Sequence, residues 1–242
     1  MAQSPAAAQT LAILDCMQYL SERLHATNTG KPRGEKEANR ETVAAQQRRR
    51  LLAATERLIA ERGCAGTTIE RIAKQARVSS ITFYDHFAGK EEAFVAAFDE
   101  AAAAALARLA SDVPTGLSWP EQVREGLRSL LVTIAANPER ATMCLIESQK
   151  GGPALLARYE AQFESAVSKL SEGRLRDEAA TGLPESLEET TAAGIAWLLR
   201  EQLETVGAEG IEEMLPRLVD VALTPYLGSA EALHVVAPSG KS

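Results

Sequence analysis

The stretch that most constrains this chain is residues 67–90, which read TTIERIAKQARVSSITFYDHFAGK. Its first part holds four apolar residues at three- and four-residue spacing: Ile69, Ile72, Ala73 and Ala76. This spacing predicts a short helix with one apolar face. A second helix is predicted after Ser79, where Phe83 and Phe87 lie one turn apart and can bury against the first helix. Two short helices joined by a tight turn, with polar side chains outside the second, are typical of a DNA-reading motif.

The sequence also predicts where the first of these helices begins. Thr67 and Glu70 have the spacing of a capping box, in which a hydroxyl and a carboxylate each accept a backbone N–H at the helix start. We therefore expect Thr67 to be the N-cap.

Matches to a known pattern extend across this stretch and the segment before it. They are Ala53, Ala54, Gly63, Thr67, Thr68, Ile72, Ala73, Val78, Ser79, Thr82, Phe83, Tyr84, His86, Phe87 and Lys90. With these residues in one register, the chain resembles the N-terminal helix-turn-helix domain of the TetR family of bacterial transcriptional regulators. The close match covers roughly residues 48–95, and the remainder resembles the family in length and helicity.

The resemblance and the composition together predict an all-α fold. Ala, Leu, Glu and Arg are abundant, and no segment has a convincing strand pattern. A three-helix helix-turn-helix domain is expected first, and a helical ligand-binding and dimerisation domain after it. The expected parts are an N-terminal extension and linker (1–40), the DNA-binding domain (41–92), the ligand-binding and dimerisation domain (93–230) and a C-terminal tail (231–242).

The resemblance assigns the DNA contacts residue by residue. Side chains at Thr82, Tyr84, His86 and Lys90 match positions that hold phosphates or border the groove, and those at Ser80, Ile81 and Tyr84 match positions that read base edges. Hydroxyl, imidazole and ammonium groups are suitable phosphate donors, and the major groove admits a helix. Asp85 is expected either to accept from a cytosine amino group or to point aside. The full predicted set is Thr68, Ser79, Ser80, Ile81, Thr82, Tyr84, Asp85, His86 and Lys90.

Two residues depart from the family pattern. Arg77 stands where the turn commonly has Gly, and a left-handed backbone there would cost a non-Gly residue on the order of 1 kcal/mol. Ile81 replaces a small residue, which allows either a thymine-methyl contact or simple gap filling. The family's DNA sequence preference is therefore not transferable.

Charge supports a DNA-binding head independently of the resemblance. Residues 48–90 hold nine basic and four acidic side chains, a net charge of +5, whereas residues 91–242 hold 12 basic and 24 acidic ones. A basic segment on an acidic body is the electrostatic pattern expected when one part of a chain binds DNA. A solvated surface helix is the ordinary alternative.

In the body, apolar spacing and Pro or Gly stop signals predict helices at 90–112, from 118 or 120 to 137, at about 139–150 and at about 154–177. The last two predicted helices, 185–206 and 211–227, carry apolar stripes with helical spacing. They predict a dimer interface at Leu187, Thr191, Ile195, Leu198, Ile211, Met214, Leu218, Val219 and Ala222. Periodicity also permits these stripes to serve only the subunit's own core. In the resembled family the last helices of two subunits form a four-helix bundle, which favours a homodimer. Pro216 requires either a kink in the last helix or a later start.

Family members are typically repressors that lose DNA affinity when a small molecule enters the C-terminal domain, and the helix starting at Lys90 is the expected coupler. Pocket candidates are Phe98, Met143, Glu147, Tyr159, Phe163, Trp197 and Arg200, although such residues are more often plain core. The chain is thus expected to be a dimeric repressor of a palindromic operator, released by a small-molecule effector. Two alternatives are a DNA-binding regulator controlled by a protein partner and an activator.

Several other classes have no support in the sequence. There is no nucleophile elbow, phosphate loop or metal-ligand cluster, so we expect neither an enzyme nor a cofactor or metal. Cys16, Cys64 and Cys144 are widely spaced and predict no disulfide framework. No segment is long and apolar enough to predict a membrane span, and a cytoplasmic protein is expected. Residues 11–24 predict a short amphipathic helix before a polar linker at 27–41, which is either a disordered tail or a basic arm for a DNA groove.

Overall fold

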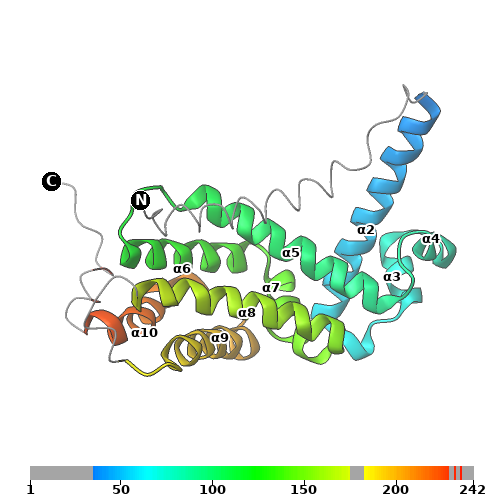
Figure 1. Cartoon of the computed structure of the whole chain (residues 1–242). Helices are drawn as coiled ribbons and strands as arrows, with labels where there is room; N and C mark the ends of the chain where they lie inside the picture. The colour runs from blue at the N-terminus through cyan, green and yellow to red at the C-terminus, as the bar shows by residue number, and fades with distance from the viewer. Residues whose placement is uncertain (1–34, 175–182, 229–231, 233–234, 236–242) are drawn as a thin grey trace. The chain divides into compact units, whose positions relative to one another are not determined.

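The structure, a computed structural model, describes residues 35–174, 183–228, 232 and 235, and for 35–39 and 173–174 the backbone alone. All regular elements in these ranges are helical, which confirms the all-α prediction (Figure 1). They are α2 (Glu35–Gly66), α3 (Ile69–Ala76), α4 (Ser80–Tyr84), α5 (Lys90–Asp112), α6 (Trp119–Ala136), α7 (Pro138–Leu145), η1 (Glu147–Lys150), α8 (Pro153–Arg174), α9 (Leu187–Thr205), η3 (Ile211–Met214) and α10 (Leu215–Leu227).

The chain divides into two units, residues 1–46 and 47–242. The described part of the first unit is the start of α2, which is helical from Glu35. The predicted linker at 27–41 is therefore too long at its C-terminal end. Beyond Gly34 the segment EKEANRE holds no Gly or Pro and is rich in good helix formers, which explains the earlier helix start. The helix predicted at 11–24 lies outside the described residues.

The start of α3 differs from the prediction by one residue. Thr68 is the N-cap, with extended backbone, and its hydroxyl accepts from the Arg71 N–H at 3.4 Å. Thr67 is buried, and its hydroxyl donates to the Gly63 carbonyl at 2.9 Å. Because this hydroxyl is used to close the end of α2, the next threonine takes the cap.

The end of α3 has a Schellman-type closure. The Arg77 N–H donates to the Lys74 carbonyl at 3.2 Å, and the Val78 N–H reaches back to Ala73 at 3.0 Å. This pattern requires a left-handed residue, and Arg77 occupies it with φ 56° and ψ 49°. The left-handed turn considered from the sequence is thus present, and it is occupied by a residue with a Cβ.

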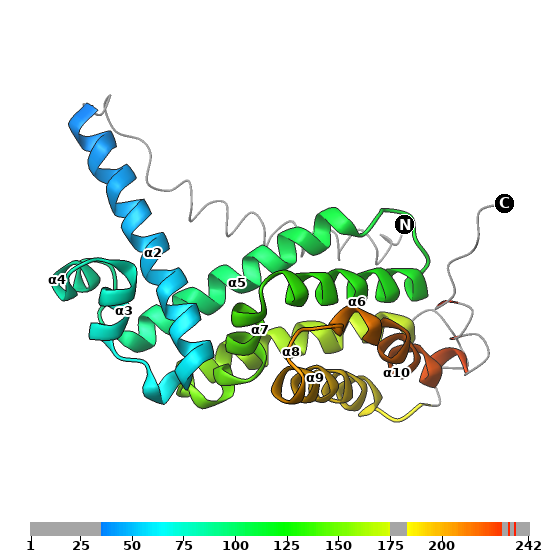
Figure 2. The ribbon, with the colours of Figure 1, turned by 180° about the vertical axis from the view of Figure 1, so that it is seen from behind.

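One hydrophobic core joins the helix-turn-helix segment to the body. In the second unit, α5 runs from α3 and α4 into the body, where α6 and α8 lie against it (Figures 1 and 2). Its Phe94 and Phe98 belong to one cluster with Ile72 and Phe83 on one side and Met143 of α7 on the other. No separate core closes at residue 92, so the head is packed directly onto the body.

The apolar stripes of the last two helices face the subunit's own core. Six of the nine predicted interface residues are buried there: Thr191, Leu198, Ile211, Leu218, Val219 and Ala222. The other three, Leu187, Ile195 and Met214, are partly buried. The alternative that the stripes serve the subunit's own core therefore holds for these six residues, because α6 and α8 cover the same face, and the homodimer interface stays a prediction. The last helix begins at Leu215, so Pro216 lies in its first turn and causes no kink.

Other predicted helices agree with the structure except near residue 146. The predicted helices at 90–112 and from 118 or 120 to 137 match α5 and α6. The helix expected from 139 to 150 is instead α7 followed by the 3₁₀ turn η1. There the Ser148 hydroxyl donates to the Cys144 carbonyl at 2.6 Å, which satisfies a carbonyl at the end of α7 by a side chain.

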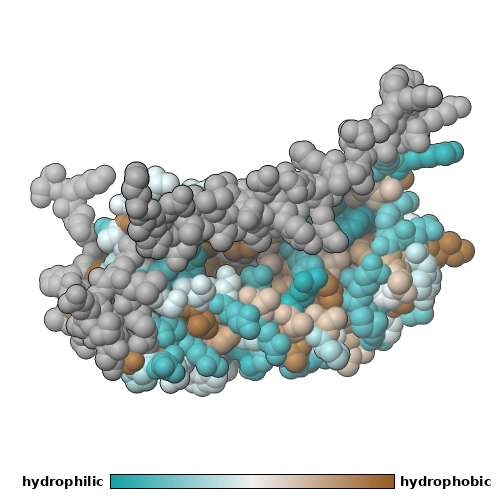
Figure 3. All heavy atoms as spheres, in the orientation of Figure 1, coloured by the Kyte–Doolittle hydropathy of each residue, from teal (hydrophilic) through white to brown (hydrophobic). Residues whose placement is uncertain are grey.

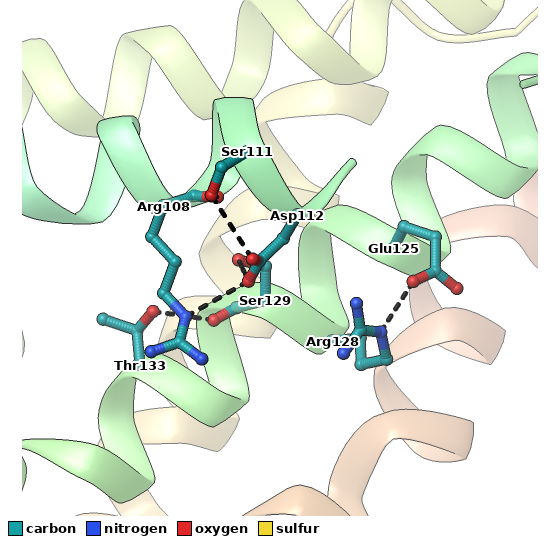
Figure 4. A network of polar contacts seen from close by, with 7 residues as sticks. All are labelled: Arg108, Ser111, Asp112, Glu125, Arg128, Ser129 and Thr133. Carbon is teal, nitrogen blue, oxygen red and sulfur yellow. Dashed lines mark hydrogen bonds and ion pairs between the residues drawn. The ribbon is translucent and has the colours of Figure 1, made fainter. Parts of the chain in front are cut away.

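A polar network fixes the far end of α5 to α6 (Figure 4). Asp112 accepts from Arg108 Nε at 3.1 Å and from the buried Ser129 hydroxyl at 3.0 Å. The Ser129 hydrogen bond, with help from the Arg108 guanidinium, lowers the pKa of Asp112 below its ordinary value.

No helix in the described ranges is both long and apolar enough to cross a membrane.

Two polar contacts connect α2 to the α7–η1 region at the edge of the shared core. Glu56 pairs with Arg140, whose Nη2 lies 2.9 Å from Glu56 Oε1, and Glu147 Oε2 accepts the Cys64 N–H at 3.1 Å. At Gly63, φ is 70°, which favours glycine, and a Cβ there would lie 2.9 Å from Glu147 Oε2 and displace that carboxylate. Burial raises the pKa of Glu56, while the hydrogen bond and charge of Arg140 oppose that rise.

Removing Arg140 tests this buried pair. Arg140→Ala leaves the Glu56 carboxylate uncompensated, and we expect a loss of about 2–3 kcal/mol at pH 7 by urea unfolding. This is less than for a fully buried pair, because the Arg140 side chain is 27% exposed. Glu56 then has a pKa raised further above 4.5 in the folded state, so folding takes up a proton and the deficit should shrink as pH falls toward 5. A deficit that is constant between pH 8 and 5 would contradict this account.

Candidate nucleic-acid interface

Helix α4 is held by its inner aromatic side chains and presents its outer ones to solvent. Phe83 is fully buried, and its ring centroid lies 5.5 Å from that of Phe87 and 5.7 Å from that of Tyr84. Ile81 is 76% exposed and Tyr84 58% exposed, although both are large apolar or aromatic residues. Figure 3 shows apolar atoms projecting at the end of the molecule where α4 lies. The outer face of α4 is therefore supported from within by the Phe83 ring, and Ile81 and Tyr84 on it stay exposed among the described residues.

The start of α4 is closed by two hydroxyl side chains. Ser79 is the N-cap, and its Oγ accepts the Thr82 N–H at 3.0 Å. The Ser79 and Thr82 hydroxyls also lie 3.0 Å from each other. Ser79 and Ser80 are exposed and Thr82 is half-buried, so this end of the helix offers hydroxyl groups in fixed positions.

The remaining predicted contacts gather around α4. His86 Nε2 lies 3.5 Å from Gln47 Oε1 of α2, and Lys90 Nζ donates to the Thr67 carbonyl at 3.4 Å. The Lys90 ammonium also lies 5.7 Å from the centroid of the Phe94 ring. These contacts hold an imidazole and an ammonium beside the helix-turn-helix. Asp85 is exposed and follows α4 directly as its C-cap.

Hydrogen bonds also fix the polar and charged side chains at the N-terminus of α3. Thr68 caps it, and the Arg71 guanidinium donates to the Gly66 carbonyl just before it. A hydrogen bond from its own backbone N–H, with a second from Thr68, lowers the pKa of Glu70 in the first turn. Sequence reasoning missed the Arg71–Gly66 contact, because no spacing rule marks a guanidinium that turns back onto a preceding loop.

Four of the seven predicted pocket residues line one hollow on the body, between α8 and α9. They are Tyr159, Phe163, Trp197 and Arg200, and the volume is about 250 Å³. Ala193 and Ala196 complete the lining, and their small size on α9 was the only signal for them in the sequence. Arg200 Nε is buried there without a hydrogen-bond partner among the described residues.

The other three predicted pocket residues lie elsewhere. Phe98 and Met143 are buried in the core shared by head and body, and Glu147 binds Cys64 and Lys150. These three residues therefore do not line this hollow, and their role in ligand binding stays a prediction. In the described part of the chain no group of three or more His, Cys, Asp or Glu side chains is placed to hold a metal ion.

The two described cysteines have environments that disfavour the thiolate. Burial, with the nearby Glu147 charge, raises the pKa of Cys64 to about 11, and burial raises that of Cys144 to about 12. Cys16 lies outside the described residues.

Comparison with known proteins agrees with this geometry. Residues 51–97 match the family of bacterial regulatory proteins described as the tetR family. The chain carries a TetR-family DNA-binding domain. The matched range spans the described helices from α2 into α5, including the outer face of α4. No curated protein sequence matches the chain.

Solved structures of bacterial regulators share the fold of about three quarters of the chain or more. The fatty acid degradation regulator FadR from Bacillus halodurans matches with a TM-score of 0.63 and 16% identity, over 81% of this chain and 97% of that one. FadR from Bacillus subtilis in complex with stearoyl-CoA gives 0.59 and 18%, over 74% and 98%. The ketosteroid regulator KstR2 of Mycobacterium tuberculosis gives 0.56 and 20%, over 73% and 93%. At these identities the likeness establishes the fold alone.

Substitutions at one outer and one inner position of α4 test which side chains of this helix pack against the protein. Ile81→Ala removes an exposed side chain, so stability should stay within about 0.5 kcal/mol of wild type. Phe83→Ala opens a cavity in the shared core and should cost about 3–5 kcal/mol. Urea unfolding of both variants checks this contrast, and a large loss for Ile81→Ala would show that this side chain packs against the protein.

Proposed function

We propose that this protein is a dimeric transcriptional repressor that binds a palindromic operator through α3 and α4. The observation that carries the proposal is the outer face of α4, where Ile81 and Tyr84 stay exposed on a helix anchored from within by Phe83. An exposed, rigidly supported helix in a basic segment is suited to the major groove. The family match over residues 51–97 supports the same role.

In this proposal most of the predicted residues have one of two roles, phosphate contact or base contact. Ser79, Thr82, His86 and Lys90 donate to phosphates and set the register, and the outer side chains of α4 contact base edges. The 76% exposed Ile81 supplies a methyl-rich surface suited to thymine methyl groups. A dimer would place two such helices at half-sites about one helical turn apart, which an inverted repeat matches.

Selection of bound fragments from a random DNA pool tests the operator proposal. The wild type should yield an inverted repeat, with affinity falling steeply as salt rises. Tyr84→Ala combined with Lys90→Ala should weaken binding at least tenfold, because it removes one groove contact and one phosphate contact from each protomer. The control is Lys169→Ala on α8, which removes an exposed charge outside both the head and the proposed dimer interface.

Binding by the double variant equal to that of the control would contradict the role of α4. Failure of the wild type to enrich any sequence would contradict the proposed function itself.

The hollow between α8 and α9 is our proposed effector site. Its lining is mostly aromatic and apolar, with the Arg200 guanidinium as its charged group. Such a lining suits a small organic anion with a flat apolar body, since a guanidinium pairs well with a carboxylate. The stearoyl-CoA in the FadR structure from Bacillus subtilis is also an amphipathic anion. A hollow of about 250 Å³ favours a smaller ligand here.

We propose that the homodimer forms through the outer faces of α9 and α10, because their inner faces are used by the subunit core. Val206, at the C-cap of α9, is 62% exposed and offers apolar surface next to the last helices. Trp197 is 58% exposed at the rim of the hollow, so it can report on both proposals.

Trp197→Glu separates the effector site from the dimer interface. We expect the variant to remain a dimer in light scattering, at twice the chain mass of 25.9 kDa. Saturating 2-naphthoate should raise the melting temperature of the wild type by several degrees and leave the variant unchanged, because the new carboxylate competes for Arg200. A monomeric variant would place the hollow at the subunit interface, and no shift of the wild type would reject this ligand class.

A further inference from the structure

The turn between α3 and α4 holds a backbone conformation that its residue does not favour. Arg77 has φ 56°, and it is the one residue other than glycine with positive φ in the described part of the chain. The hydrogen bonds of Arg77 and Val78 to the last turn of α3 impose this conformation. Glycine adopts this conformation without steric cost, so glycine would be the more favourable residue here for the stability of the fold.

The Arg77 side chain makes no polar contact that would offset this backbone strain. It is exposed, and its guanidinium makes no hydrogen bond or ion pair with any residue that the structure describes. Two nearby arginines behave differently, since Arg71 donates to the Gly66 carbonyl and Arg48 lies over the Phe87 ring. Strained backbone of this kind concentrates at functional sites, where the side chain serves something outside the protein.

The position of Arg77 indicates which external partner its side chain contacts. Arg77 lies two residues before Ser79, the N-cap of α4, in a segment with a net charge of +5. A guanidinium forms bidentate hydrogen bonds with phosphate and keeps its charge at all working pH values. Other exposed head residues such as Arg49, Arg62 and Lys74 lie in helical backbone and carry no such strain.

We propose that Arg77 is a DNA-backbone contact of this protein, retained at a strained turn because its guanidinium binds a phosphate beside the α4 groove. The contact rests on the proposed DNA-binding function and adds to it a residue at a position where the family pattern has glycine. Its role is sequence-independent, so it strengthens binding to all sites alike.

Three substitutions separate charge from backbone geometry. Arg77→Lys keeps a positive charge, Arg77→Asn tolerates the left-handed backbone without charge, and Arg77→Gly removes both charge and strain. Affinity is measured for the DNA fragment selected by the wild type, from 0.05 to 0.3 M salt, together with the melting temperature of each free protein.

We expect Arg77→Asn and Arg77→Gly to bind about tenfold or more weakly at 0.15 M salt, with a salt slope smaller by about 2 for a dimer that loses two phosphate contacts. Arg77→Lys should stay within about threefold of wild type. The melting temperatures of the Asn and Gly variants should equal or exceed that of the wild type. Weaker binding by a protein that is no less stable is a result that damage to the fold does not produce.

Wild-type affinity and salt slope in Arg77→Asn would overturn this inference while leaving the proposed function intact. Equal losses in all three variants with an unchanged slope would also overturn it, since the turn geometry would then be responsible. Absence of DNA binding by the wild type would overturn both.

Discussion

The shared core around α5 is the constraint on which the rest of this structure depends. Phe94 and Phe98 contact the helix-turn-helix and the body within one buried cluster, so neither part can close its hydrophobic face alone. Closely packed interiors transmit small displacements instead of absorbing them. The pair of Glu56 with Arg140 and the contact of Cys64 with Glu147 add fixed polar links at the edge of the same core. The orientation of α4 is therefore set by the body as well as by the head.

This packing connects the proposed effector site to the proposed DNA-binding face through a small number of packed side chains. Tyr159 of α8 lines the hollow, and it also packs against the shared core, where Leu155 one turn earlier is fully buried. A ligand that displaces the Tyr159 ring would therefore disturb the core cluster that contains Phe94 and Phe98 of α5. In the proposed dimer, two heads bound to fixed half-sites would tolerate little change in separation, so a small shift of α5 would be enough to reduce affinity.

The sequence predicted the positions of the helices well, but it predicted less well what each helix packs against. The spacing of apolar residues and the motif at 67–90 predicted the helix-turn-helix and most helices of the body, because helix periodicity is local. Periodicity does not show what covers an apolar face, so it could not decide whether Leu218 packs in the subunit's own core or against a partner subunit. For the same reason it could not decide whether Phe98 lines a pocket or belongs to the core. The cap at Thr68 was missed by one residue, because the hydroxyl of Thr67 closes the preceding helix, a tertiary detail that a capping pattern does not contain.

Hydrogen–deuterium exchange of the full chain, with and without its selected DNA duplex, is the most direct test of this account. The amides of residues 68–90 should exchange more slowly in the complex, because α3 and α4 are covered by DNA, and those of α5 near Phe94 should slow as well through the shared core. The amides of α10 should show no such direct protection. Exchange in residues 68–90 that is unchanged by bound DNA would contradict the central claim that this helix pair is the DNA-binding surface.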